Sequence, residues 1–189
     1  MKRFRQSKLW VLGALFGGLI GFTQNASAGL SGHTLGVETQ FPNIGDICCG
    51  AANVVVGAGV ELPTGSFPSY NSNAFVDASD AQIIYGQTAG TSYVPAAFNG
   101  FHFFDVFATI DDIIGVTIDP STDLSGFDAS RLSFDADNIY INMQGLGAAG
   151  AHQVVINIEF GGGRIPEPAS LALLGLGLGL LGAARRSRS

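Results

Sequence analysis

The feature that most constrains the fold is an alternation of apolar and polar side chains with a period of two residues. It is clearest where Val154, Ile156, Ile158 and Phe160 alternate with Val155, Asn157 and Glu159. Successive side chains of a β-strand point to opposite faces of the sheet, whereas a helical face repeats every 3.6 residues. The pattern therefore predicts a half-buried β-strand, and no amphipathic helix pattern interrupts the body of the chain.

The same alternation predicts more strands. Ile114, Val116 and Ile118 are expected to share one face, as are Leu132 and Phe134. Between Phe134 and Ile139 the apolar positions change from even to odd numbers, which predicts a bulge or turn at residues 136–138. From Ile139 the alternation continues through Ile141 and Met143. Further candidate strands cover residues 37–41, 52–62, 81–85 and 98–107.

Residues 29–164 thus provide roughly seven to nine short strands, separated by clusters of Gly, Pro, Asn, Asp and Ser. We predict one all-β domain, an antiparallel β-sandwich that is jelly-roll-like, in which alternate residues of two sheets fill one core. A small closed barrel is the alternative. Buried aromatic rings contribute much apolar area, so we expect four phenylalanines at the centre of the core: Phe101, Phe103, Phe104 and Phe107.

Residues 1–28 have the order of a secretory signal peptide. Four cations within the first eight residues precede the uncharged apolar run 9–22, and the small residues Ala26 and Ala28 end the segment. We expect signal peptidase to cut after Ala28 and the chain to be exported. An uncleaved anchor is the alternative, but the apolar run is short for a membrane span of about 20 residues.

The C-terminal end has three parts in a fixed order. Residues 169–184 are uncharged and apolar, and they predict a transmembrane helix of about 24 Å. The prolines of the preceding Pro166-Glu167-Pro168 fix φ and lack N–H donors, so the peptide at the membrane surface stays extended. The basic tail 185–189 is expected on the cytoplasmic side, through Arg185, Arg186 and Arg188.

This tripartite end, residues 165–189, resembles the PEP-CTERM protein-sorting signal. The resemblance implies a precursor anchored in the inner membrane by its C-terminal helix. Exosortase, a membrane-embedded transpeptidase-like protease, would recognise and cut the tail. It further implies a protein of the cell surface or extracellular matrix, a structural or interaction component associated with exopolysaccharide, biofilm or cell-envelope proteins. Stretches between residues 98 and 146 also resemble the β-rich body of many PEP-CTERM proteins. A plain C-terminal anchor is the alternative.

Charge limits the partners of the body. Residues 29–164 contain two arginines against fourteen acidic residues, a net charge of −12. Such a body is repelled by nucleic acids and by anionic lipid surfaces. We therefore expect no nucleic-acid partner.

Motifs of catalysis are missing from the sequence. His33, His102 and His152 lack the spacing of zinc ligands, and neither a nucleophile elbow nor a phosphate-binding loop occurs. The three glutamates of the body lie in strand-like segments and suggest no catalytic pair. We expect no catalytic residue, no enzyme activity and no cofactor except a candidate calcium ion.

The alternative function is a calcium-dependent or carbohydrate-binding module. Carboxylate oxygens are the ligands that calcium prefers. The candidate ligands are Asp111, Asp112, Asp135 and Asp137, although aspartates are also common in turns. For sugars, Tyr70 and Tyr93 are the candidate contacts, because the only tryptophan lies in the signal peptide.

Cys48 and Cys49 are adjacent and are the only cysteines of the chain. In an oxidising compartment they can form a vicinal ring, pair between molecules, or stay reduced and buried. The sequence leaves these three possibilities open.

Overall fold

The computed structural model describes residues 29–66 and 72–162. The predicted signal peptide and the C-terminal sorting segment lie outside these residues. The described elements are β1 (Thr34–Gln40), β2 (Ile47–Val55), β3 (Ala74–Ser79), β4 (Gln82–Gln87), β5 (Thr91–Ser92), β6 (Gly100–Asp105), β7 (Ile113–Ile118), the 3₁₀ turn η1 (Ala129–Arg131), β8 (Leu132–Phe134), β9 (Asn138–Asn142), β10 (Gly147–Ala148) and β11 (His152–Phe160).

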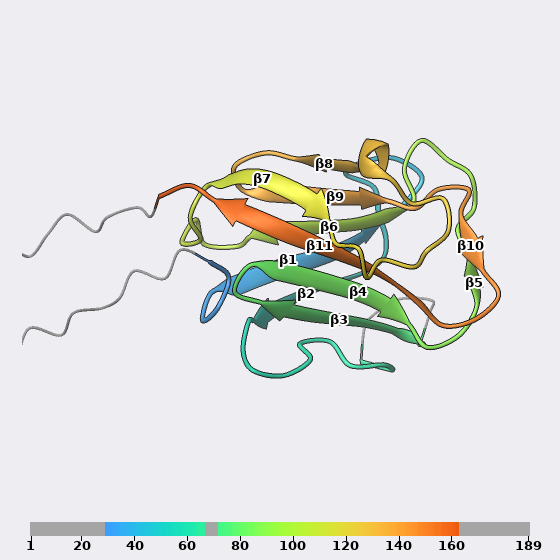
Figure 1. Cartoon of the computed structure of the whole chain (residues 1–189), viewed down its shortest axis with the longest axis horizontal. Coiled ribbons are helices and arrows are strands. Elements are labelled where there is room, and N and C mark those ends of the chain that lie inside the picture. The colour runs from blue at the N-terminus through green and yellow to red at the C-terminus, as the bar shows by residue number, and fades with distance from the viewer. Residues whose placement is uncertain (1–28, 67–71, 163–189) are drawn as a thin grey trace, which may run out of the picture.

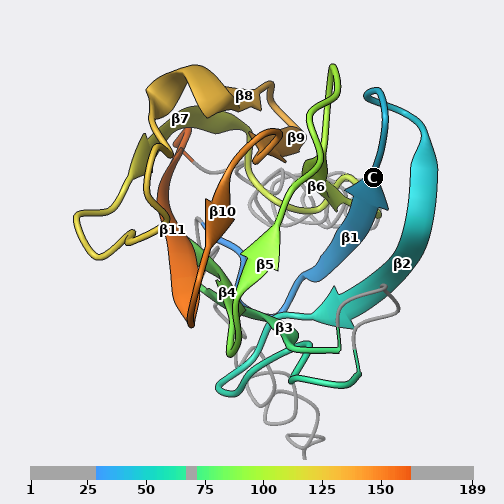
Figure 2. The ribbon, with the colours of Figure 1, turned by 90° about the vertical axis from the view of Figure 1, so that its right-hand side faces the viewer.

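The strands form two stacked sheets and a short ribbon, and every pairing is antiparallel. One sheet has the order β2-β1-β6-β9-β8, the other β3-β4-β11-β7, and β5 pairs with β10. Figure 1 shows the two sheets face to face, and Figure 2 shows the β5–β10 ribbon in front of one end. The all-β, antiparallel expectation is confirmed for the described residues.

The jelly-roll expectation is not confirmed. The hairpins β1–β2, β3–β4 and β8–β9 keep consecutive strands within one sheet. The ladders form separate sheets, so the described residues do not make the single closed sheet of a barrel either.

The core lies between the two large sheets. Strand β11 shows why the alternation was informative: Val154, Ile156 and Ile158 are all buried against the opposite sheet. Val155, on the other face of β11, is buried too, and its backbone carbonyl accepts a hydrogen bond from Thr122 Oγ1 of the 119–123 loop. The largest fully buried side chains come from both sheets: Val37, Phe103, Ile139 and Ile141 from one, and Val76, Ile83, Tyr85, Val154 and Ile156 from the other.

The predicted phenylalanine centre is half right. Phe101 and Phe103 are buried, whereas Phe104 is half-buried and Phe107 is 67% exposed. Phe104 follows the opposite parity, so its ring lies on the outer face of β6, over Gly36 of the neighbouring strand. Phe107 lies beyond the end of β6. Because consecutive residues of this run are aromatic, the sequence does not show which of them face the core.

Strand β7 also departs from the prediction. Ile114 was expected to face the core but is 56% exposed, whereas Ile113 packs against the core. A register shift at Glu159/Phe160 of the paired strand displaces the alternation there.

The predicted turn at residues 136–138 is confirmed, since Asp135 N–H donates to Asn138 C=O at 3.0 Å between β8 and β9. Phe134 lies on the edge strand β8 and is 43% exposed.

The 119–123 loop gives a prediction about acid stability. Asp119 accepts hydrogen bonds from Ser121 N–H at 2.9 Å and from Asn157 Nδ2 at 3.0 Å, and these bonds hold the pKa of its carboxyl below the ordinary 3.8. A depressed pKa stabilises the fold above the unfolded-state value and is lost as the pH falls through the folded-state value. Asp119→Asn should therefore flatten the fall in unfolding free energy between about pH 5 and about pH 2 in urea titrations.

Ser121→Ala is the matched comparison, because it removes the hydroxyl donor to Asp119 and keeps the backbone donor. It should give an intermediate slope. Equal slopes for Asp119→Asn and the natural chain would contradict the prediction.

Candidate functional site

A cavity of about 500 Å³ opens at the end of the sandwich that carries the β5–β10 ribbon. Its walls come from both sheets and from the segment after β5: Thr39 at the end of β1, the cysteines of β2, Tyr85 and Gln87 of β4, Tyr93, and Phe101 of β6. The segment after β5 is fixed beside the cavity, because Tyr93 N–H donates to Leu146 C=O at 2.8 Å and Gly145 N–H donates to Tyr93 C=O at 2.8 Å.

Two buried tyrosines form a hydrogen-bonded chain along the cavity. The hydroxyl oxygens of Tyr85 and Tyr93 are 3.0 Å apart, and that of Tyr93 lies 3.3 Å from Nε2 of His152. Gln87 Nε2 donates to the Tyr85 hydroxyl. Burial raises the pKa of both tyrosines above the ordinary value, so both stay neutral. The ring of Tyr85 also packs on Phe101, with centroids 4.3 Å apart.

Two polar atoms of the cavity wall have no hydrogen-bond partner among the described residues. They are Oγ1 of Thr39 and Oε1 of Gln87, both buried. The Gln87 side chain cannot turn away without cost, because its amide nitrogen bonds Tyr85. An unsatisfied buried group costs about 1–3 kcal/mol. Both atoms have almost no accessible surface, so neither is open to a molecule in the cavity.

The adjacent cysteines form a vicinal disulfide, which decides among the three possibilities that the sequence left open. Both Cys48 and Cys49 line the cavity. Cys48 is exposed and Cys49 is half-buried, so the sulfur atoms are part of an accessible wall.

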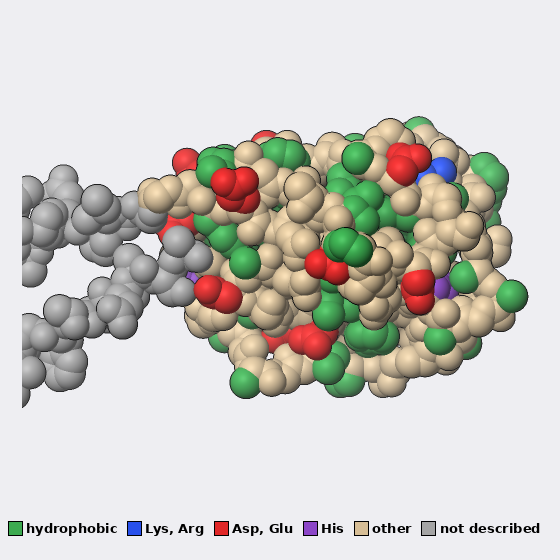
Figure 3. Space-filling view, viewed as in Figure 1, with side chains coloured by type: hydrophobic (Ala, Val, Ile, Leu, Met, Phe, Trp, Pro, Cys, Tyr) green, Lys and Arg blue, Asp and Glu red, His purple; other side chains and the backbone are tan. Residues whose placement is uncertain are grey.

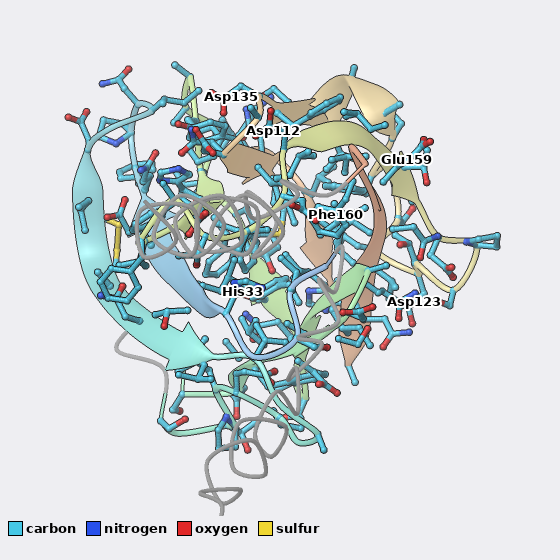
Figure 4. The ribbon with its side chains drawn as sticks, turned by 90° about the vertical axis from the view of Figure 1, so that its left-hand side faces the viewer. His33, Asp112, Asp123, Asp135, Glu159 and Phe160 are labelled. Carbon is cyan, nitrogen blue, oxygen red and sulfur yellow. A yellow bond between two sulfur atoms is a disulfide. The ribbon has the colours of Figure 1, made fainter. Side chains whose placement is uncertain are left out.

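The aspartates predicted as calcium ligands meet at the other end of the sandwich. Ile113 N–H donates to Ala136 C=O at 2.9 Å, which brings the loop of Asp111 and Asp112 to the β8–β9 turn of Asp135 and Asp137 (Figure 4). Oδ1 of Asp135 accepts from Asp137 N–H at 2.9 Å and from Asn138 Nδ2 at 2.8 Å, and these turn bonds lower its pKa. Within residues 29–66 and 72–162, no three His, Cys, Asp or Glu side chains are placed to hold a metal ion. Calcium binding stays a prediction.

The three histidines lie apart. His33 contacts Thr109, and His152 belongs to the tyrosine chain of the cavity. His102, on the outer face of β6, is held by Glu38 Oε2 at 3.2 Å and by Asn138 Oδ1 at 2.8 Å, and it stacks on Tyr140 with ring centroids 4.4 Å apart. His102 is thus a satisfied strand residue.

Other predicted residues lie outside the part of the chain that the structure describes. They are Ala26, Ala28, Tyr70, Pro166, Glu167, Pro168, Arg185, Arg186 and Arg188. Among the residues that are described, no helix is long and apolar enough to cross a membrane. The predicted span, residues 169–184, is not among them.

Acidic side chains are more prominent than cationic ones on the face that Figure 3 shows. Arg131 is the only lysine or arginine of the described residues. It holds the chain after β9, since Nη1 donates to Gln144 C=O at 2.9 Å. No cationic surface is therefore present on the described part of the body.

The described body is an acidic all-β domain, and the sequence continues into a C-terminal segment with flanking prolines, an apolar run and a basic end. Comparison with family models identifies this tail, because the PEP-CTERM protein-sorting motif matches residues 164–189. The chain therefore carries a PEP-CTERM sorting motif, which implies exosortase as its processing partner and an exported, membrane-anchored precursor. Neither the curated proteins nor the solved structures gave a match.

Proposed function

We propose that the chain is a non-enzymatic structural or interaction component of the cell surface or extracellular matrix, associated with exopolysaccharide. The observation that carries the proposal is the sorting motif at residues 164–189. The signal-peptide pattern of residues 1–28 and the acidic body support it, since a body of net charge −12 is suited to a hydrated extracellular environment rather than to an anionic surface.

The test is the intact mass of the protein from the envelope and from the medium, in cells with and without exosortase. We expect the mature species to lack residues 1–28 and the tail beyond Pro166–Pro168, and the second loss to require exosortase. The matrix fraction should contain this processed species. A protein that keeps residues 171–189 in both strains would contradict the sorting proposal, and a processed protein absent from the matrix would contradict the matrix role.

A carbohydrate-binding module is the second candidate function. The observation that favours it is the position of Tyr93, which the sequence indicated as a sugar contact and which lines the cavity. The buried ring has a hydrogen-bonded hydroxyl, so it contributes to a formed pocket rather than to an exposed platform.

A further inference from the structure

We propose that the Cys48–Cys49 disulfide is a site of thiol–disulfide exchange, which a small thiol without a negative group reaches through the cavity. Such a site goes beyond both functions proposed above, since neither the sorting tail nor a polysaccharide takes part in it. It gives the cavity a redox-sensitive wall. Three properties of the cysteine pair carry the proposal: the loop that it closes, its place in β2 and its access to a reagent.

The disulfide closes almost no loop. A disulfide stabilises a fold mainly by closing a loop in the unfolded chain, and the effect grows with the length of that loop. Cys48 and Cys49 are one residue apart in the sequence, so their bond joins no two distant parts of the chain. Opening the bond should therefore leave the two sheets and their core in place, and the pair has a role other than cross-linking the fold.

The pair lies in an irregular part of an edge strand. Thr39 of β1 pairs with Gly50 of β2. The next residue of β1, Gln40, pairs with Ile47, so the two cysteines between them have no partner residue in β1. In the described part of the chain β2 pairs with β1 alone, and Figure 2 shows it at the side of its sheet. Reduction therefore frees a short segment of an edge strand and breaks no pair of the ladder.

Both cysteines are accessible to a reagent. Cys48 is exposed, Cys49 is half-buried, and both line the cavity of about 500 Å³. This volume lies in the range of small-molecule sites, about 300–1,000 Å³, so a small thiol can enter. Figure 1 shows that the described ends of the body, residues 29 and 162, lie at the opposite end of the sandwich. The chain therefore enters and leaves the body away from the disulfide.

The surroundings select among thiols by charge. Every residue that lines the cavity is uncharged, whereas residues 29–164 have a net charge of −12. A thiol reacts as its thiolate, so a reagent with a second negative group is repelled more strongly by the acidic body. No cation of the cavity wall offsets this repulsion. We therefore expect neutral and cationic thiols to react faster than anionic thiols of the same size.

The exchange takes two steps. First, the reagent thiolate attacks Sγ of Cys48, the more exposed of the pair, and the bond to Cys49 breaks. The Cys49 sulfur leaves with the electron pair of that bond and takes a proton from water. A second reagent thiolate then attacks the reagent sulfur of the mixed disulfide and releases the Cys48 thiolate, which takes up a proton. Two reagent thiols are thus oxidised to one disulfide, and the protein pair is reduced by two electrons.

The experiment treats the full chain, purified in an uncharged detergent, with three monothiols of similar size: 2-mercaptoethanol, cationic cysteamine and anionic 2-mercaptoethanesulfonate. Iodoacetamide traps free cysteines at timed intervals, intact mass measures loss of the disulfide, and circular dichroism records the fold. We expect the disulfide to open in the folded protein, at least about tenfold faster than the chain unfolds. Per thiolate, the anionic reagent should react at least about threefold more slowly than 2-mercaptoethanol at low salt, and this difference should vanish at about 1 M salt.

Variants test the route of the reagent and the role of the bond. Val94→Trp adds an indole ring at a position of the cavity lining that is 58% exposed, and it should slow the exchange at least about threefold. Val60→Trp is the matched control, since Val60 is 46% exposed and outside the lining, and it should react like the natural chain. The double variant Cys48→Ser with Cys49→Ser should melt within about 4 °C of the natural chain.

Any of four results would overturn the proposal. They are reduction no faster than unfolding, a double cysteine variant that does not fold, equal rates per thiolate for the three thiols at low salt, and equal exchange rates for Val94→Trp and Val60→Trp. The last result would place the attack outside the cavity. None of these measurements involves exosortase or a polysaccharide, so failure of the exchange site and failure of the proposed functions are separate results.

Discussion

Gly100→Ala is expected to lower the free energy of unfolding by about 3–5 kcal/mol, which approaches the whole stability of many domains. Gly100 begins β6, the middle strand of the five-stranded sheet, and pairs with both Gln40 of β1 and Asn142 of β9. A Cβ atom at this position would overlap the carbonyl oxygen of Ile141. The obstacle is backbone that belongs to the sheet, so no side-chain rotation can relieve it. Urea unfolding followed by circular dichroism measures the effect.

Other glycines provide a graded comparison. Gly36 and Gly86 would place a Cβ against the rings of Phe104 and Phe75, which can move partly aside, so alanine there should cost less than at Gly100. Gly59 has open space around it, and Gly59→Ala is the control without loss. If Gly100→Ala unfolds at the same urea concentration as Gly59→Ala, the close pairing of β6 with β9 is wrong.

The strands that the sequence predicted well are those in which apolar and polar residues alternate cleanly. β9 and β11 have this pattern, and their inward residues are buried as expected. β3, which was not predicted, alternates through Ala74, Val76 and Ala78, and its small side chains give a weak signal. The prediction was wrong for part of β7 because a register shift interrupts the period of two there. It was wrong for part of the β6 phenylalanine run because apolar residues lie on both faces of that strand. Local pattern also carries no information on which sheet a hairpin joins, so the strand order could not be predicted.

The candidate cavity was less accessible to sequence reasoning than the fold. The sequence indicated Tyr93 as a candidate sugar contact and left the pairing of the adjacent cysteines open, but nothing in their spacing brings β2 to the segment after β5. Gln87 and Thr39 belong to no motif either, and nothing in the sequence indicates that they line a cavity. The calcium hypothesis relied on composition, and the structure shows that the Asp135 carboxylate accepts bonds from the turn that contains it.

Replacing Pro166, Glu167 and Pro168 together by alanine should nearly abolish processing of the tail. We expect the rate of cutting to fall at least about tenfold, so that less than about a tenth of the protein is processed. A tenfold fall corresponds to the loss of about 1.4 kcal/mol of transition-state binding. The family match covers these residues, and a proline fixes its own φ and has no N–H donor. Alanines restore the N–H groups and favour helix, so the peptide can join the apolar segment 169–184 instead of remaining available to the protease. Intact mass spectrometry of the envelope fraction measures the ratio of uncut to cut species.

The matched control is Pro63→Ala, a proline on the exposed surface of the body, which should be processed like the natural chain.

A second variant, with Arg185, Arg186 and Arg188 changed to glutamine, separates recognition from membrane orientation. The sequence predicts that these arginines orient the span, so this variant should accumulate uncut although its Pro-Glu-Pro peptide is intact. Normal cutting of the alanine triple variant would show that exosortase does not read residues 166–168, and the sorting assignment would then depend on the apolar and basic parts of the tail alone.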